Sequence, residues 1–222
     1  MVNNTPMIST TEEIREFARQ CLSDSPGSHD WDHVERVCNL CMQIAAVEGA
    51  DKRTLEIAAY LHDIGRPYED ASKGKICHAE KGAEMARSLL EKYPLSQERK
   101  RNIIHCILTH RFRGNHRPES QEAKILFDAD KLDAIGAIGV GRAFLFAGEV
   151  GARLHNAAVD PAHTEAYTQD DTGYREFKLK LSRIKDQMLT PEGRRIALER
   201  HAFMADFFKR FLEEYNGSVR SR

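Results

Sequence analysis

Residues 58–66, AAYLHDIGR, end an apolar helical stripe with the adjacent pair His62 and Asp63. The spacing of apolar residues upstream of this pair predicts a helix over 51–64, and Pro67 disfavours its continuation. Adjacent helical residues point about 100° apart, so both reach one ion only beside the helix end. A negative side chain near a helix C-terminus is unfavourable, and a nearby cation would relieve it. The alternative is a solvated Asp63 beside a helix-terminal histidine.

The rest of the chain has the same helical periodicity. Apolar residues recur at spacings of three and four, and no alternating strand-like run of any length occurs. Three glycines between 136 and 141 predict either close packing or a break in the segment 122–148. Residues 66–77, 113–121 and 150–172 are expected to be loops, the last of them irregular. The sequence therefore predicts an all-α fold, with helices over 10–22, 30–48, 51–64, 78–93, 96–112, 122–148, 173–188 and 191–215.

Length and composition limit the number of domains and the classes of function. The 222 residues predict one domain or one domain with an extension, and such a chain can bury about 70% of its unfolded surface. The 33 Lys+Arg and 34 Asp+Glu give a net charge of −1, which excludes nucleic-acid binding by bulk charge. A local basic pocket for one phosphate stays compatible with this balance.

No targeting signal is recognisable in the sequence. No stretch approaches about 20 apolar residues, so no membrane span is expected. The first residues lack the basic start and apolar core of a signal peptide. The five cysteines have no disulfide framework spacing, and Cys38 and Cys41 lie at apolar helical positions, which favours core packing over a metal or redox role. We therefore expect a cytoplasmic protein with reduced thiols.

Four residues form a candidate metal-ligand set: His33, His62, Asp63 and Asp130. Three of them lie on or beside apolar stripes, where a lone ionised carboxylate is costly unless a metal or a donor neutralises it. Two imidazoles and two carboxylates suit Mn²⁺, Fe²⁺, Co²⁺, Ni²⁺, Zn²⁺ or Mg²⁺. Such an ion lowers the pKa of a bound water and neutralises phosphate oxygens. The alternatives are a hydrogen-bonded core histidine at His33 and a helix cap at Asp130.

Five short sequence motifs resemble those of a known family. They are HDWDHVERV at 29–37, AAYLHDIGR at 58–66, HAEKGAEMA at 78–86, ILTHR at 107–111 and DADKLDAIGAIGVGR at 128–142. In this order they resemble the H…HD…D signature of the HD superfamily of metal-dependent phosphohydrolases. Within it the chain looks most similar to the bacterial YedJ/YpgQ type, which is thought to hydrolyse nucleotides. The resemblance covers roughly residues 29–142.

The resemblance implies a compact helical bundle of the HD-domain type with a C-terminal helical extension. Its parts are an N-terminal helix and turn at 1–27, a phosphohydrolase core at 28–148, and a loop and helices at 149–222 that pack on the core. It also implies a divalent metal ion held by the four residues above. His78 and His110 would complete a second metal site or contact phosphate, so one ion is favoured and two are possible. The implied catalytic residues are Asp63, His78, His110 and Lys131.

Substrate contacts are expected from five residues within these motifs: His29, Arg66, Arg111, Lys131 and Asp133. Arginine suits bidentate phosphate recognition and lysine acts as a point charge. The alternative for each cation is a solvated surface residue. Asp133 is expected either to orient a ligand or water, or to be solvated. For Asp128 a solvated face is favoured.

The sequence therefore predicts an enzyme whose partner is a small phosphate substrate. A nucleotide is favoured, with pyrophosphohydrolysis of a nucleoside triphosphate as the first choice. The alternatives are a nucleoside monophosphatase, a (p)ppGpp-type hydrolase, or a non-catalytic regulatory module that binds metal or nucleotide. The GYP motif of cyclic-di-GMP phosphodiesterases is absent. No membrane partner is expected, an oligomer is possible, and residues 150–172 are a candidate lid.

Overall fold

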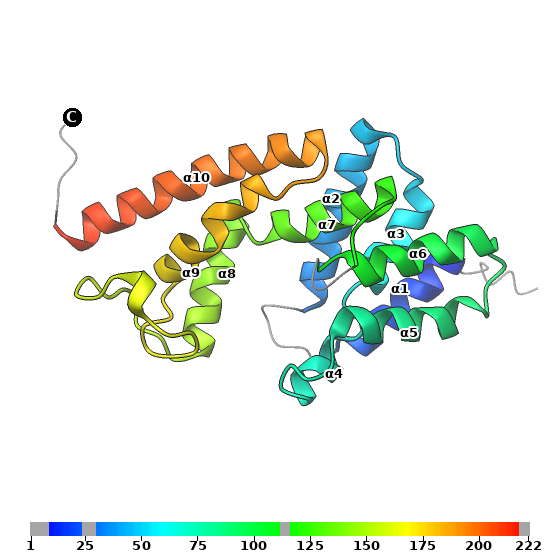
Figure 1. The fold of residues 1–222 in the computed structure, drawn as a ribbon, viewed down its shortest axis with the longest axis horizontal. Coiled ribbons are helices and arrows are strands. Elements are labelled where there is room, and N and C mark those ends of the chain that lie inside the picture. The colour runs from blue at the N-terminus through cyan, green and yellow to red at the C-terminus, as the bar shows by residue number, and fades with distance from the viewer. Residues whose placement is uncertain (1–8, 24–29, 112–115, 218–222) are drawn as a thin grey trace, which may run out of the picture. The chain divides into compact units, whose positions relative to one another are not determined.

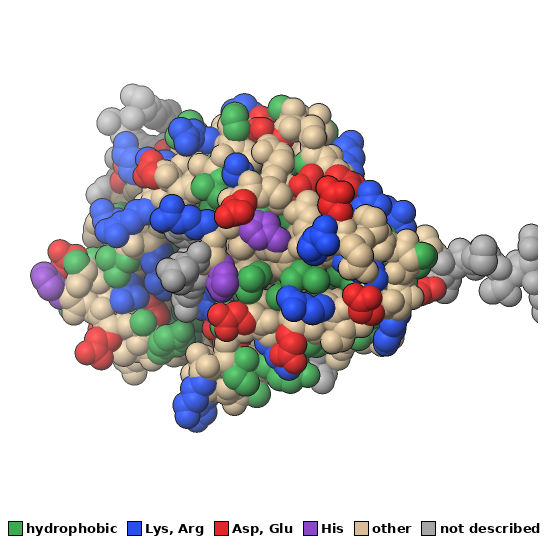
Figure 2. Space-filling view, turned by 45° about the vertical axis from the view of Figure 1, so that its right-hand side comes forward, with side chains coloured by type: hydrophobic (Ala, Val, Ile, Leu, Met, Phe, Trp, Pro, Cys, Tyr) green, Lys and Arg blue, Asp and Glu red, His purple; other side chains and the backbone are tan. Residues whose placement is uncertain are grey.

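The computed structural model describes residues 9–23, 30–111 and 116–217, and within these ranges the protein is all-α without a strand. The chain divides into two compact units, 1–129 and 130–222 (Figure 1). None of the described helices is both long enough and apolar enough to cross a membrane. Basic and acidic side chains are interspersed over the face seen in Figure 2.

The first unit is a bundle in which α3 contacts α1, α2 and α6, while α5 packs on α6 and α4 (Figure 1). Its core is formed by fully buried aliphatic side chains such as Ile14, Val37, Ile44, Leu55 and Ile107. The last helix of this unit, α7, begins in the first unit and ends in the second. The helices of the first unit are α1 (Thr10–Cys21), α2 (Trp31–Glu48), α3 (Lys52–Leu61), α4 (Arg66–Ala71), α5 (His78–Leu90), α6 (Gln97–Thr109) and α7 (Gln121–Asp133).

Polar caps set where these helices begin. Ser9 and Glu12 form a capping box at α1, and the side chains of Asp30, Asp51 and Ser96 accept backbone N–H groups at the starts of α2, α3 and α6. Three of these caps begin helices that carry or end at candidate site residues, namely α2, α3 and α6.

The expectation of a loop over 66–77 is wrong in its first half, because Arg66–Ala71 forms α4. Pro67 lies in the first turn of this helix, where its missing N–H and fixed φ are tolerated. Gly65 brings the turn before α4 against the backbone of α5. A Cβ at this position would lie 2.2 Å from the carbonyl oxygen of His78 and 2.7 Å from the nitrogen of Gly82. This close approach sets the position of the His62–Asp63 turn relative to the start of α5.

The second unit has an aromatic core. α8 packs on α9 and α10, and α10 also contacts η2. Phe144, Phe207, Phe208 and Phe211 lie within 6.3 Å of one another by ring centroid, and Phe177 stacks on Phe208 at 4.7 Å. The elements of this unit after α7 are α8 (Gly136–Glu149), η1 (Pro161–His163), α9 (Gly173–Leu179), η2 (Leu181–Asp186) and α10 (Pro191–Tyr215).

Two of the expected long helices are interrupted. The segment 122–148 breaks between α7 and α8, where Gly136 has a φ of 80° that side chains rarely adopt. The break confirms one of the two alternatives that the glycines predict. The segment 173–188 is also divided, into α9 and the 3₁₀ helix η2. Residues 150–172 contain only η1 as regular structure, as expected of an irregular loop.

The irregular segment is nevertheless tied to α9 by a buried ion pair. Nη1 of Arg175 lies 2.7 Å from Oδ1 of Asp171, and Oδ2 of Asp171 accepts the N–H of Tyr167 at 2.8 Å. Arg175 also donates through Nε to Oγ1 of Thr164 at 2.7 Å and through Nη2 to its carbonyl oxygen at 3.0 Å. Both oxygens of the buried carboxylate are therefore hydrogen-bonded.

Candidate metal centre

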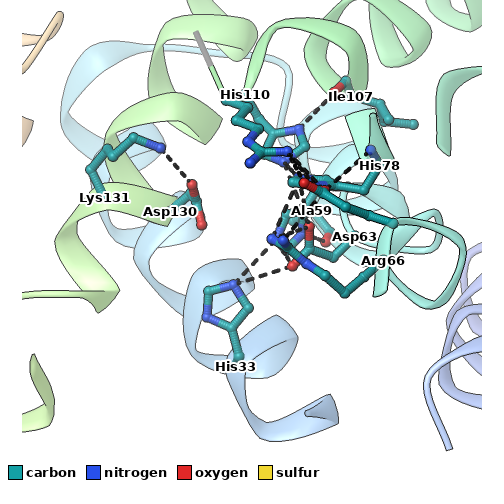
Figure 3. A network of polar contacts seen from close by, with 12 residues as sticks. His33, Ala59, Asp63, Arg66, His78, Ile107, His110, Asp130 and Lys131 are labelled. Carbon is teal, nitrogen blue, oxygen red and sulfur yellow. Dashed lines mark hydrogen bonds and ion pairs between the residues drawn. The ribbon is translucent and has the colours of Figure 1, made fainter. Parts of the chain in front are cut away.

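Two groups of side chains in the first unit could each hold a metal ion. They are His33, His62 and Asp63, and Asp63, His78 and His110. All five residues are buried, with at most 2% of each exposed. Asp63 belongs to both groups, and Figure 3 shows the rings of His33, His78 and His110 turned toward it.

Helix ends bring these residues together. His33 lies in the first turn of α2, where its N–H donates to the side chain of Asp30. His62 and His110 are the C-caps of α3 and α6, and His78 is the first residue of α5. The first four sequence motifs of the resemblance therefore meet in one place, because α3 and α6 end there and α2 and α5 begin there.

The distances within both groups suit ligands of one ion. In the first group, Nε2 of His33 and Nε2 of His62 are 3.4 Å apart, and they lie 3.8 Å and 3.6 Å from Oδ2 of Asp63. In the second, Nε2 of His78 and Nε2 of His110 are 3.0 Å apart, and they lie 3.3 Å and 3.6 Å from Oδ1 of Asp63. Ligands bonded at about 2.1 Å to one ion are separated by about 3.0–3.5 Å. Two distances in the first group and one in the second are slightly longer than this.

Hydrogen bonds fix which ring nitrogen carries the proton. Nδ1 of His62 and Nδ1 of His110 each donate to the carbonyl oxygen three residues earlier, at 2.7 Å and 2.6 Å. Nδ1 of His78 donates to the carboxylate of Glu69. A neutral ring that donates through Nδ1 presents an unprotonated Nε2. Three lone pairs are thus directed toward Asp63, an arrangement that a cation would stabilise.

The charges of the centre agree with this arrangement. Burial would raise the pKa of Asp63, but the facing His62 and Arg66 hold it well below its usual range. Burial lowers the pKa of His78 to about 3, so this ring is neutral at pH 7. Oδ2 of Asp63 is buried and has no hydrogen-bond donor among the described residues. A buried carboxylate oxygen that lies among imidazole nitrogens and accepts no hydrogen bond from the described residues fits a divalent metal ion.

The predicted residues of the second unit form ion pairs of their own. Nζ of Lys131 lies 2.8 Å from Oδ2 of Asp130, and both side chains are partly exposed (Figure 3). Nη1 of Arg142 lies 2.8 Å from Oδ2 of the buried Asp133. The solvated alternatives for Asp133 and Asp128 are wrong, because both side chains are buried. The role of Asp130 as a fourth ligand stays a prediction.

The remaining predicted substrate contacts differ in their surroundings. Nη2 of Arg66 lies 3.4 Å from Oδ1 of Asp63 and 3.4 Å from Nε2 of His78, at the edge of the second group. Nη1 of Arg111 is instead 2.6 Å and 2.8 Å from the two oxygens of Glu69. His29 lies outside the described residues.

Glu69 is a residue of the centre that the sequence interpretation missed. It lies in a stretch expected to be a polar loop, yet only 9% of it is exposed. Burial would raise its pKa, but hydrogen bonds from Arg111 and His78 bring the pKa to about 2. No local pattern marks it, because these partners lie 42 and nine residues away along the chain.

The fold and this centre define a class: an all-α protein with a buried histidine–aspartate site that could hold a divalent metal. The HD domain family model matches residues 30–135. The uncharacterized protein YpgQ of Bacillus subtilis is 34% identical over 215 residues, which cover 95% of this chain and 96% of YpgQ. The chain belongs to the HD-domain family, which confirms the resemblance read from the sequence.

Solved structures agree with this assignment. A crystal structure of Bacillus subtilis YpgQ in complex with ADP has a TM-score of 0.70 and 32% identity, and the match covers 92% of this chain and 93% of that chain. The crystal structure of an HD-superfamily hydrolase from Bacillus thuringiensis has a TM-score of 0.73 and 28% identity, covering 93% and 96%. Both similarities extend over most of the chain, beyond the residues that the family model matches.

Proposed function

We propose that the protein is a metal-dependent phosphohydrolase that acts on a small nucleotide, with pyrophosphohydrolysis of a nucleoside triphosphate as the favoured reaction. The observation that carries the proposal is Asp63, each of whose buried oxygens faces two imidazole nitrogens. Membership of the HD-domain family and similarity to an HD-superfamily hydrolase support hydrolysis. The ADP in the YpgQ crystal structure supports a nucleotide as the substrate class.

In this proposal His33, His62, Asp63 and Asp130 hold the ion, and His78 and His110 either hold a second one or contact phosphate. A bound divalent ion supplies a nucleophilic water near neutral pH and neutralises charge on a phosphate oxygen. Hydrogen bonds at Nδ1 of His62, His78 and His110 orient these rings so that the Nε2 of each is available for ligation. The ion is not identified by these ligands, since several divalent metals accept them.

The cations around the centre have different roles in the proposal. Arg66 lies at the edge of the site with 17% of its side chain exposed, so it can meet an incoming phosphate. Lys131 is paired with Asp130 and partly exposed, which makes it the second phosphate contact. Nη1 of Arg111 contacts both oxygens of the buried Glu69, and we assign to Arg111 the neutralisation of this carboxylate and to Arg66 and Lys131 the recognition of phosphate.

The test is product release from a panel of nucleoside tri-, di- and monophosphates and (p)ppGpp. Chelator-treated protein is assayed alone and after addition of Mn²⁺, Mg²⁺, Co²⁺ or Ni²⁺. We expect metal-restored release of pyrophosphate from triphosphates. Release of phosphate from monophosphates alone would replace this reaction with the monophosphatase alternative.

The matched controls separate the site from the fold. The double variant His62→Ala, Asp63→Ala should abolish turnover, whereas Asp186→Ala, which removes an exposed ion pair of the second unit, should leave it unchanged. Absence of turnover with every metal, despite metal binding, would favour the regulatory module over the enzyme.

A further inference from the structure

The three histidines with a defined tautomer do not obtain it in the same way. His62 and His110 end their helices and donate Nδ1–H to a carbonyl of their own last turn. The carbonyls of a last helical turn have no intrahelical partner and are available for this. His78 begins α5, and the first turn of a helix offers N–H groups instead of carbonyls. Its ring therefore needs an acceptor from elsewhere in the fold.

Glu69 is that acceptor. Its carboxylate lies at the start of α5, where Oε2 accepts the ring Nδ1–H of His78 and also lies 3.4 Å from its backbone nitrogen. Nη1 of Arg111 is 3.1 Å from the same ring nitrogen. The carboxylate is closer, and an ionised carboxylate only accepts, so the hydrogen must be on Nδ1. Nε2 of His78 is then left to face Asp63 and His110.

Arg111 balances the charge of this contact. A carboxylate alone beside an imidazole would favour the protonated ring, which cannot ligate a metal. The guanidinium of Arg111 contacts both oxygens of Glu69, and Nη1 of Arg66 lies 3.6 Å from Oε2. These cations offset the negative charge, so Glu69 orients the ring without charging it.

We propose that Glu69 is a positioning residue, which holds His78 as its Nδ1–H tautomer so that Nε2 can join Asp63 and His110 in binding a cation. Arg111 acts through Glu69 as its counter-charge. The proposal rests on the proposed function in one respect, namely that the group of Asp63, His78 and His110 binds a divalent ion.

The tautomer is measured directly by ¹H–¹⁵N spectra of the histidine rings in metal-free protein. We expect His78, assigned by its loss in His78→Gln, to carry its proton on Nδ1. In Glu69→Ala the ring should become a mixture of tautomers. Glu69→Gln keeps an acceptor in place and should restore the Nδ1–H form. The matched control is Asp70→Ala, an exposed carboxylate of the same helix, which should leave the ring unchanged.

Metal binding is measured by calorimetric titration with Mn²⁺ alone. Loss of a residue that orients a metal-binding histidine costs about 10–100-fold in affinity, which we expect for Glu69→Ala. In a His78→Gln background the same substitution should cost nothing further, because Glu69 acts through His78. Circular dichroism checks that each variant is folded, and Glu69→Gln provides a folded comparison if Glu69→Ala is not.

The outcomes separate this inference from the proposed function. An unchanged His78 tautomer in Glu69→Ala, or unchanged Mn²⁺ binding in His78→Gln, overturns the inference, even if nucleotides are hydrolysed. A loss in Glu69→Gln as large as in Glu69→Ala also contradicts it, since the acceptor is retained. If the tautomer and the Mn²⁺ coupling follow expectation but no nucleotide is hydrolysed, the proposed function alone fails.

Discussion

Each unit of the protein buries an aspartate beside an arginine, and the two sites differ in how the carboxylate is satisfied. Asp171 of the second unit accepts Arg175 at 2.7 Å and the N–H of Tyr167 at 2.8 Å, one with each oxygen. Asp63 of the first unit lies 3.4 Å from Arg66, and its Oδ2 has no donor among the described residues. Both side chains are 2% exposed or less.

The difference separates a structural charge from a binding site. Asp171 joins the irregular segment to α9, and its hydrogen bonds are complete within the fold. Asp63 lies among four imidazole nitrogens, and its Oδ2 accepts no hydrogen bond from the described residues, so this is a carboxylate that could bind a metal ion. Burial alone does not distinguish the two residues, whereas the count of donors around each oxygen does.

The largest expected effect is the loss of metal binding in Asp63→Asn. The amide keeps the shape of the side chain but removes the charge that both groups share. We expect no Mn²⁺ binding by calorimetry and a fall in nucleotide hydrolysis of about 1,000-fold or more, which corresponds to about 4 kcal/mol. Full activity or wild-type Mn²⁺ affinity in this variant would show that Asp63 is not the centre of the site.

An intermediate effect on stability is expected from Asp171→Ala. Removing one partner of a buried ion pair leaves Arg175 uncompensated and costs about 3 kcal/mol of the free energy of unfolding. Urea unfolding followed by circular dichroism measures this cost, and Mn²⁺ affinity should stay at the wild-type value. Asp186→Ala, which removes an exposed carboxylate paired with the partly exposed Lys185, should cost less than about 0.5 kcal/mol. Equal losses of stability in Asp171→Ala and Asp186→Ala would contradict the expected difference between a buried and an exposed aspartate.

A smaller effect than that of Asp171→Ala is expected at Asp51, an exposed aspartate that caps α3. Burial would raise its pKa, but hydrogen bonds from Arg99 and Thr54 lower it below the ordinary value of 3.8. A depressed pKa in the folded state stabilises the protein above the unfolded pKa, and this contribution is lost as pH falls through the folded value. At pH 7, Asp51→Ala should cost about 1 kcal/mol, as for other N-caps.

Urea unfolding of metal-free protein between pH 7 and pH 3 tests the sign. The difference between wild type and Asp51→Ala should shrink as pH falls below 3.8. Asp51→Asn keeps a capping oxygen without the charge, so its stability should lack this acid-dependent part. A difference that grows on acidification would contradict the depressed pKa.

Much of the fold could be predicted because its signals are local. Apolar spacing and caps place α2 and α10 at Trp31–Glu48 and Pro191–Tyr215, within one residue of expectation. The helix α4 was missed because Pro67 was interpreted only as a terminator, although it also suits a first turn. The break after Leu179 has no comparable signal, since no glycine or proline stands there.

The residue types of the candidate site could be predicted, but the hydrogen bonds and ion pairs between them could not. The HD signature pointed to His33, His62 and Asp63, and the structure brings them together. The engagement of Arg111 by Glu69 depends on side chains 42 residues apart, which no periodicity links. Nor does the sequence show the carbonyls that set the tautomers of His62 and His110, because this depends on where each helix stops.

Gly65 has a consequence for how this chain can diverge. A side chain at this position collides with the backbone of α5, which cannot rotate away as a flexible side chain can. At Gly82, a Cβ would meet only ordinary contacts of 3.4 Å or more. Alanine can therefore replace Gly82 during evolution but not Gly65. The separation of Asp63 from His78 depends on Gly65 having a hydrogen atom where every other residue has a Cβ.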